Sequence, residues 1–209
     1  MKKKLLIIFV KNIISGNVKT RLAKSIGHIG ASEIYKELVS ITINVAATID
    51  VDKEIYFSEI IEDTNWNNMT KKIQYGVDLG ERMKNAFSDG FVSGFESIVL
   101  VGSDLPDISK NIINMAFKAL ENAEIVFGPA QDGGYYLIGM NKQYNSLFEN
   151  KPWSKSNLLK ITLQYLIQNN INYHLLETLN DIDTYEDLLA SNFYKNNKKI
   201  QQNILYLND

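Results

Sequence analysis

The stretch of residues 128–136 places one carboxylate, Asp132, among residues that give the backbone unusual freedom. It reads Gly-Pro-Ala-Gln-Asp-Gly-Gly-Tyr-Tyr and directly follows an apolar run. Proline fixes the start of such a loop, and the paired glycines Gly133 and Gly134 let the backbone turn and approach a ligand where a side chain would collide. This composition is typical of a binding loop and predicts that Asp132 lies beside a ligand.

A second polar segment follows the first apolar run of the chain. It contains Gly16 and then Lys19 and Arg21, just before a long helical pattern. Two cations beside unpaired backbone amides near the start of a helix can bind phosphate. From spacing alone, solvated surface charges are the simpler interpretation of both residues.

Asp104 follows a third apolar run, residues 98–101, within the sequence Gly-Ser-Asp-Leu-Pro. Ligands of open α/β sheets bind beyond the carboxyl ends of the strands, which is where this carboxylate is expected. A hard divalent cation needs only one or two carboxylates besides ligand phosphate oxygens and water. The alternative is structural, because aspartate also commonly opens a turn or caps a helix.

A later acidic segment contains Asp181 and Asp183. In an extended chain, the spacing of two residues directs both carboxylates to one side. Thr184 and the acids after it also resemble a helix capping box, so a structural role competes with a ligand role. The two roles can coexist.

Several classes of site are excluded by what the chain lacks. It has no cysteine, which excludes disulfides, thiolate metal sites and a cysteine nucleophile. Neither the phosphate-loop pattern of ATPases nor the glycine fingerprint of dinucleotide-binding proteins occurs. The two histidines, His28 and His174, are far apart in the chain, so a histidine-based metal site or catalytic triad is not expected.

Apolar patterning predicts a single α/β domain. Short runs at residues 5–10, 98–101 and 125–127 are typical of strands buried on both faces, with weaker strands at residues 54–57, 135–140 and 172–176. Helical spacing covers residues 34–49 and 112–120, the latter after a Ser109 cap, with further helices at about 80–91, 155–169 and 184–191. This alternation predicts a three-layer α/β/α sandwich with a mostly parallel central sheet. Residues 1–191 are the predicted domain, and residues 192–209 form a final helix or a partly ordered tail.

Charge and hydropathy bound the partners and the compartment. The net charge of −2 gives no general attraction to nucleic acid or to anionic membranes, so neither is an expected partner. No segment approaches the roughly 18 apolar residues of a membrane span. The apolar run at residues 5–10 is too short for a secretory signal, and together with the absence of cysteine it favours a cytoplasmic protein. The sequence does not define an oligomeric state.

Five motifs together resemble a known family. They are Gly-Asn-Val-Lys-Thr-Arg-Leu at 16–22, Asp-Leu-Gly-Glu-Arg-Met at 78–83, Gly-Ser-Asp-Leu-Pro at 102–106, the stretch 128–136, and Pro-Trp-Ser at 152–154. The chain from about residue 4 to about residue 190 is similar to the bacterial DUF2064 family of nucleotide-diphospho-sugar transferase-like proteins. This resemblance implies the glycosyltransferase-A fold. The first loop departs from the family's usual form, which has proline and a second small residue where this chain has Asn12-Ile13-Ile14-Ser15.

The resemblance assigns roles to the candidate residues. It implies that Asp104 binds Mg²⁺ or Mn²⁺, with Asp183 as second ligand and Asp181 next. It also implies a catalytic set, formed by Lys19, Arg21, Asp104 and Asp132. The nucleotide-binding set that it implies contains Gly16, Lys19, Arg21, Gln74, Gly76, Gly80, Ser103 and Asp104. The remaining substrate contacts fall on Gly133, Gly134, Tyr135, Trp153 and Ser154. Competing interpretations are a plain turn and helix around Gly80, a core position for Trp153, and a bracing role for Asp132.

Three functions follow from these expectations. The first is a metal-dependent glycosyltransferase that binds a nucleotide-diphosphate sugar, with Lys19 and Arg21 neutralising phosphate oxygens of the leaving group. The second uses the same residues as a nucleotidylyltransferase, which joins a nucleoside triphosphate to a sugar phosphate or other phosphate and releases pyrophosphate. The third is a non-catalytic nucleotide-binding domain. In each, the partner is a nucleotide or nucleotide-sugar small molecule.

Overall fold

The computed structural model describes residues 2–13, 18–62, 66 and 69–207. One sheet contains the strands β1 (Lys4–Val10), β2 (Asp52–Phe57), β3 (Thr70–Ile73), β4 (Ser97–Gly102), β5 (Ile125–Pro129), β6 (Tyr135–Met140) and β7 (Tyr173–Leu175). Their order across the sheet is β3-β2-β1-β4-β6-β5-β7. All neighbouring strands run parallel except β6, which is antiparallel to both β4 and β5. The mostly parallel sheet expected from the sequence is confirmed.

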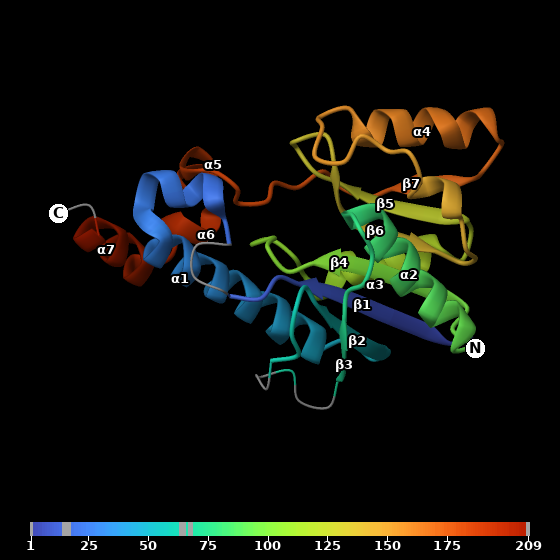
Figure 1. The fold of residues 1–209 in the computed structure, drawn as a ribbon, viewed down its shortest axis with the longest axis horizontal. Coiled ribbons are helices and arrows are strands. Elements are labelled where there is room, and N and C mark those ends of the chain that lie inside the picture. Colours follow the sequence, from blue (N-terminus) through green and yellow to red (C-terminus); the bar gives the residue numbers. More distant parts are fainter. Residues whose placement is uncertain (1, 14–17, 63–65, 67–68, 208–209) are drawn as a thin grey trace.

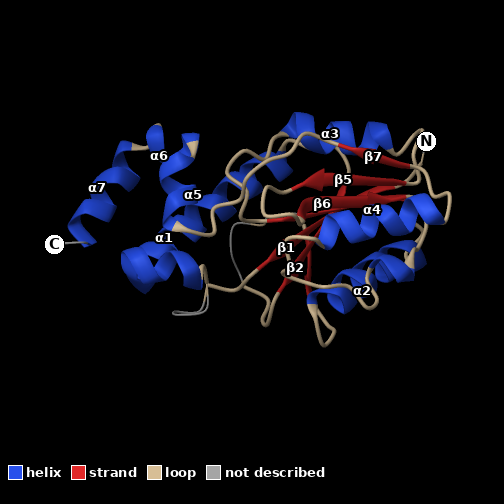
Figure 2. Cartoon of the chain, turned by 90° about the horizontal axis from the view of Figure 1, so that it is seen from above, coloured by secondary structure: helices blue, strands red, loops and turns tan. Residues whose placement is uncertain are grey.

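Helices cover both faces of this sheet (Figure 1, Figure 2). The helices are α1 (Thr20–Ala47), α2 (Leu79–Val92), α3 (Lys110–Ala119), α4 (Leu158–Gln168), α5 (Tyr185–Ala190), α6 (Asn192–Lys195) and α7 (Lys198–Leu207), with a 3-10 turn at Asn145–Leu147. One core cluster joins α1 and α3 to the sheet, and a second joins α2 and α4 to its other face. The three-layer α/β/α sandwich is therefore confirmed.

Strand β1 explains why the sheet is buried on both sides. Its side chains alternate between the two clusters, since Leu6 and Ile8 belong to the α1/α3 side and Leu5 and Ile7 belong to the α2/α4 side. All four are 0% exposed. A strand covered on both faces needs apolar residues at every position, which is the continuous run that the sequence contains.

The predicted strands and helices all occur, most with boundaries shifted by a few residues; the exception is α1, which begins at Thr20 and not near residue 34. The predicted Ser109 cap of α3 is also confirmed, because its hydroxyl accepts from the backbone amide of Ile112. Strand β3 is absent from the sequence prediction. It reads Thr-Lys-Lys-Ile and lies at the sheet edge, half-exposed and without an apolar run to mark it.

A third core cluster extends the molecule beyond the sheet. Helix α1 is interrupted at Gly27, whose φ of 73° and ψ of 164° are non-helical. The part of α1 before this kink packs with α5 and α7 through Leu22, Ile26, Leu188 and Ile204. The predicted tail thus forms two helices, α6 and α7, which join this cluster with α1, although the domain boundary at residue 191 stays a prediction.

None of the described helices combines the length and apolar character that a membrane crossing demands. The cytoplasmic location stays a prediction.

Candidate functional site

A cavity of about 670 Å³ lies at the carboxyl ends of β1 and β4. The loops after these strands line it together with the β5–β6 turn, the first turn of α2, the segment before α4 and the segment before α5. Most residues predicted to act at a site line this cavity: Lys19, Arg21, Gln74, Ser103, Asp104, Asp132, Gly134, Tyr135, Trp153, Ser154 and Asp183. The fold therefore brings together motifs that are far apart in the chain.

Three carboxylates meet at one side of the cavity. Asp104 comes from the loop after β4, and Asp181 and Asp183 come from the segment that leads into α5. One oxygen from each lies within 4.8 Å of the others. All three side chains are partly buried. The predicted pair Asp104 and Asp183 is thus side by side, and Asp181 joins it as a third member.

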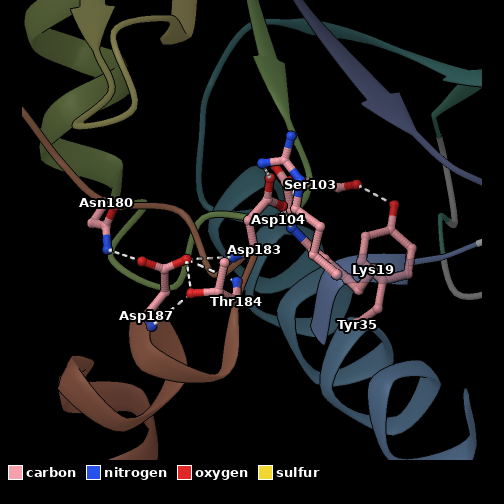
Figure 3. Close-up of polar contacts among 9 residues, drawn as sticks. Lys19, Tyr35, Ser103, Asp104, Asn180, Asp183, Thr184 and Asp187 are labelled. Carbon is pink, nitrogen blue, oxygen red and sulfur yellow. Dashed lines mark hydrogen bonds and ion pairs between the residues drawn. The ribbon is translucent and has the colours of Figure 1, made fainter. Parts of the chain in front are cut away.

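Lys19 lies between two of these acids (Figure 3). Its Nζ is 2.9 Å from Oδ2 of Asp104 and 3.0 Å from Oδ1 of Asp183, and its side chain is only 5% exposed. Arg21 approaches the same cluster more loosely, with its Nη1 3.7 Å from Oδ2 of Asp183. Lys19 has φ 48° and ψ 49°, a left-handed conformation that costs a non-glycine residue free energy. Such strain concentrates at functional sites, and here it places the ammonium group between the acids.

The site's charges perturb one another. Burial alone lowers the pKa of Lys19, but the carboxylates of Asp104 and Asp183 outweigh it and hold that pKa above its ordinary value. Burial raises the pKa of Asp104, yet Lys19 outweighs burial and lowers it. At Asp181 the balance is reversed: burial, and then the charges of Asp104 and Asp183, raise its pKa to about 6, and the opposing effect of Lys19 is too small to offset them. The cluster therefore carries more negative charge than Lys19 neutralises.

We expect Asp181→Asn to stabilise the metal-free protein at neutral pH. A pKa raised from 3.8 to about 6 means that the ionised carboxylate destabilises the fold above about pH 6 and that the penalty vanishes as the pH falls toward 4. Removing it at pH 7 is worth on the order of 1–3 kcal/mol, or roughly 3–8 °C in Tm for a chain of this size. Calorimetry from pH 4 to 8 measures this, with exposed Asp50→Asn as control; equal Tm values for Asp181→Asn and wild type at pH 7 would contradict it.

The donor set fits a hard divalent cation. Carboxylate oxygens are the ligands that Mg²⁺ and Mn²⁺ prefer, and these three lie close enough together for one ion to be shared after small side-chain shifts. Burial raises the pKa of Asp181, and the neighbouring carboxylates of Asp104 and Asp183 raise it further; a bound cation would oppose both effects. Asp104, Asp181 and Asp183 are accordingly the residues that could hold a metal.

A buried hydrogen-bonded link supports the Asp104 loop. The Tyr35 hydroxyl pairs with Oγ of Ser103 at 2.8 Å (Figure 3). It also accepts from the backbone amide of Lys11 at 2.8 Å. It therefore connects helix α1 to the chain after β1 and to the residue before Asp104. Sequence reasoning missed Tyr35, because a tyrosine on the buried face of a helix looks like a core residue.

The capping role predicted near Thr184 coexists with the acidic cluster. The Thr184 hydroxyl accepts from the Asp187 amide, and the Asp187 carboxylate accepts from the amides of Thr184 and Asp183 (Figure 3). The capping box thus belongs to Asp187 and fixes the backbone of Asp183. The Asp183 carboxylate is left to face Lys19.

The loop in the glycine-rich segment is shorter than predicted at its start, because β5 extends through residues 128 and 129, while β6 begins at residue 135 as predicted. The turn itself therefore spans 130–134. Oδ1 of Asp132 accepts from the Gly134 amide at 2.8 Å, which is the bracing interaction expected as an alternative. Asp132 also lines the cavity, so bracing does not remove it from the site.

We expect Gly133→Ala to disrupt this loop more than its backbone angle alone requires. Gly133 has φ +89°, and a Cβ there would meet Ser156 O at 1.9 Å. Gly94, at φ +85° with nothing within 4 Å, is the matched control for backbone strain. Denaturant unfolding should place Gly133→Ala about 1–3 kcal/mol below Gly94→Ala in stability. Equal losses of stability in the two variants would show that the loop around Gly133 can move away from Ser156 at no cost.

Two predicted nucleotide-binding glycines lie outside the cavity lining, and a third lies outside the described residues. A Cβ at Gly80 would collide with the Trp153 ring at 2.4 Å, and one at Gly76 would meet the Arg82 amide at 2.8 Å. Close approach at both positions is therefore to the protein's own atoms. Gly16 falls in the part of the chain that is not described, so its nucleotide contact stays a prediction.

Both tyrosines at the start of β6 line the cavity. They point to opposite faces of the sheet, as alternation requires: Tyr135 packs beside Phe127, and Tyr136 donates to the Glu177 carbonyl. Of the two, only Tyr135 is a predicted substrate contact; Tyr136 lines the cavity as well, because the cavity opens over the end of the sheet and reaches both faces. Trp153 lines the cavity as well as packing on Gly80, so it has a packing role, and its substrate contact stays a prediction.

The family comparison covers the middle of the chain. The model of the family described as "Uncharacterized protein conserved in bacteria (DUF2064)" matches residues 35–155, more than half of the 209 residues. No curated protein matches the chain.

Solved structures resemble the whole chain. A provisionally assigned nucleotide-diphospho-sugar transferase from Desulfovibrio desulfuricans G20 is 28% identical with a TM-score of 0.84, over 99% of this chain and 97% of that one. The inositol-1-phosphate CTP transferase of T. maritima is 15% identical at a TM-score of 0.56, over 100% and 98%. A Mycobacterium tuberculosis H37Rv protein solved in complex with manganese is 11% identical at a TM-score of 0.55, over 90% and 96%. The last two likenesses concern the fold alone.

Proposed function

The chain belongs to the DUF2064 family, and on that premise we propose that it is a divalent-metal-dependent transferase that binds a nucleotide-diphosphate sugar and passes the sugar to an acceptor. One observation supports this above all others. Two loops distant in sequence bring Asp104, Asp181 and Asp183 together with Lys19 and Arg21 at the rim of one cavity. Carboxylates that can hold a cation and cationic side chains that can bind phosphate lie in one place, which is the combination that a metal-bound diphosphate requires.

The roles of the protein groups follow from their charges. Asp104 and Asp183, with Asp181, would hold Mg²⁺ or Mn²⁺, which would supply positive charge to the diphosphate oxygens. Arg21 is 65% exposed and can turn its planar fork to a phosphate. Lys19, which pairs with Asp104 and Asp183, would add a point charge at the same place. Both cations, Lys19 and Arg21, stabilise the negative charge that grows on the leaving nucleotide.

Asp132 is assigned to the acceptor side. Its Oδ1 is held by the Gly134 amide, which leaves its other oxygen for an acceptor or sugar hydroxyl. Gln74 lines the nucleotide side, with its amide group donating to the Tyr56 carbonyl at 2.9 Å. Its side-chain oxygen, which has no hydrogen-bond donor among the described residues, is the atom that we assign to a contact with the base.

Nucleotidylyl transfer is the second candidate. The structural neighbours include several cytidylyltransferases, which join a nucleotide to a second substrate. The specific observation in its favour is that Arg82 and Lys155 also line the cavity without an acidic partner among the described residues. The phosphate group of a sugar phosphate would pair with Arg82 and Lys155 on that side of the cavity.

Two assays separate the candidates. The protein is incubated with Mg²⁺ or Mn²⁺ and a panel of nucleotide sugars, and release of nucleoside diphosphate is measured; a parallel panel of nucleoside triphosphates with sugar phosphates is scored for pyrophosphate. Diphosphate release supports glycosyl transfer, and pyrophosphate release replaces it with nucleotidylyl transfer. Metal-dependent thermal stabilisation by nucleotides without either product would leave a non-catalytic binding domain.

A further inference from the structure

The chain places both of its arginines at the same cavity. It contains 22 basic residues, of which only Arg21 and Arg82 are arginine and all others are lysine. Lysine supplies the positive charge at every other basic position of the chain, whereas both arginines line this one cavity. Arginine differs from lysine by a rigid, planar fork of donors that matches the oxygens of phosphate or carboxylate. This distribution points to two anion contacts in the cavity.

The two arginines come from opposite walls. Arg21 lies at the start of α1, beside the acidic cluster and on the α1/α3 side of the sheet. Arg82 lies in the first turn of α2, which packs on the other face. Since one phosphate group already suits Arg21, Arg82 is available for a second anionic group.

Arg82 is held in place with its donors free. Its Nε donates to the Gly76 carbonyl at 3.3 Å, while among the described residues none accepts from its four terminal N–H groups. The turn at Gly76 makes this anchor possible, because a Cβ there would sit 2.8 Å from the Arg82 amide. A half-buried guanidinium fixed at one end and unpaired at the other is suited to a ligand.

Lys155 joins Arg82 on this wall. It lines the cavity, is exposed, and has no acidic partner among the described residues. Its segment is fastened to α2, since Gly80 packs on the Trp153 ring and Lys84 pairs with Glu149 at 3.2 Å. The first turn of α2 and residues 149–155 therefore form one continuous wall, and the two cations of this wall that line the cavity, Arg82 and Lys155, have no acidic partner among the described residues.

We propose that Arg82 and Lys155 form a second anion subsite, and that the second substrate of the transfer carries a phosphate or carboxylate group there. This inference rests on the proposed function, which assigns the Arg21 side of the cavity to the nucleotide diphosphate. A neutral sugar or alcohol would leave two cations unused on the acceptor wall. The subsite selects the charge of the acceptor, whichever bond is formed.

The two arginines also provide the test, because each gives one Nε–H signal in a ¹⁵N NMR spectrum. Arg21→Lys and Arg82→Lys assign the two signals. Mg²⁺ with pyrophosphate is added first and should move the Arg21 signal, as the proposed function requires. Inorganic phosphate or acetate is then titrated into the loaded protein, and one of them should move the Arg82 signal saturably; the stronger anion identifies the group.

A matched variant pair completes the design. Lys155→Gln should weaken anion binding at Arg82 about fivefold, the effect of losing one exposed charge-assisted contact. Lys160→Gln removes the same charge from an exposed position on α4 outside the cavity lining and should change nothing. An Arg82 signal that ignores both anions, or that responds equally in the two variants, overturns the subsite while leaving the proposed function standing. A silent Arg21 signal with Mg²⁺ and pyrophosphate counts against the proposed function instead.

Discussion

Asp104→Asn is expected to abolish metal-dependent nucleotide binding while the protein stays folded. The substitution keeps the volume of the side chain and a hydrogen-bond acceptor for Lys19, but it removes the charge at the centre of the acidic cluster. Loss even of a residue that merely supports a metal ligand costs about 10–100-fold in affinity, so loss of a ligand charge should cost at least about 100-fold. Titration with Mn²⁺, alone and with nucleotide, measures the change.

A nearby aspartate supplies the control for this experiment. Asp107 lies three residues later in the same loop, is exposed, and is absent from the cavity lining. Asp107→Asn changes the net charge by the same amount and should leave metal affinity at the wild-type value. Unaltered nucleotide affinity of Asp104→Asn in the presence of Mg²⁺ or Mn²⁺ would show that the acidic cluster does not hold the cation.

The location of the site was predictable because parallel sheets gather their loops. Residues 5–10 and 98–101 are apolar throughout, which marks them as β1 and β4, and the polar motif after each run then falls at one edge of the sheet. The proximity of Lys19 to Asp104 follows from this rule. No knowledge of side-chain geometry was needed for it.

The part that could not be predicted depends on how distant segments cross. Asp181 and Asp183 follow β7, an edge strand that β4, β6 and β5 separate from β1. They reach Lys19 only because the chain returns across the sheet toward α5. The local sequence around Asp181 and Asp183 does not indicate that the chain returns in this way. The inclusion of Asp183 came from the family resemblance, and that of Asp181 as a full member of the cluster required the coordinates.

Two further omissions have the same physical origin. Tyr35 looks like any tyrosine on a buried helical face, and only its contacts with Ser103 and Lys11 distinguish it. The glycines at 76 and 80 were interpreted as sites of close ligand approach. The structure has them packed against Arg82 and Trp153, so a glycine in a sequence indicates close packing without identifying the neighbour.

Lys19→Met is expected to move metal binding and transfer in opposite directions. The ammonium group occupies the space between Asp104 and Asp183 that a cation would share, so its removal should strengthen Mn²⁺ binding about tenfold, a change of about 1.4 kcal/mol. The same substitution removes a positive charge from the place assigned to the diphosphate. Loss of one such charge-stabilising group typically lowers turnover by about 10²–10³-fold.

The stability of this variant should depend on metal. Without a cation, the acids lose their buried partner at a cost on the order of 2 kcal/mol, less than the roughly 3–5 kcal/mol of fully buried pairs because the two carboxylates are 39% and 40% exposed. Mn²⁺ should restore the loss, so the metal-induced rise in Tm is larger in Lys19→Met than in wild type. Lys24→Met, an exposed lysine on the same helix, controls for the charge change. Weaker Mn²⁺ binding in Lys19→Met would mean that the lysine organises the acids for the cation instead of competing with it.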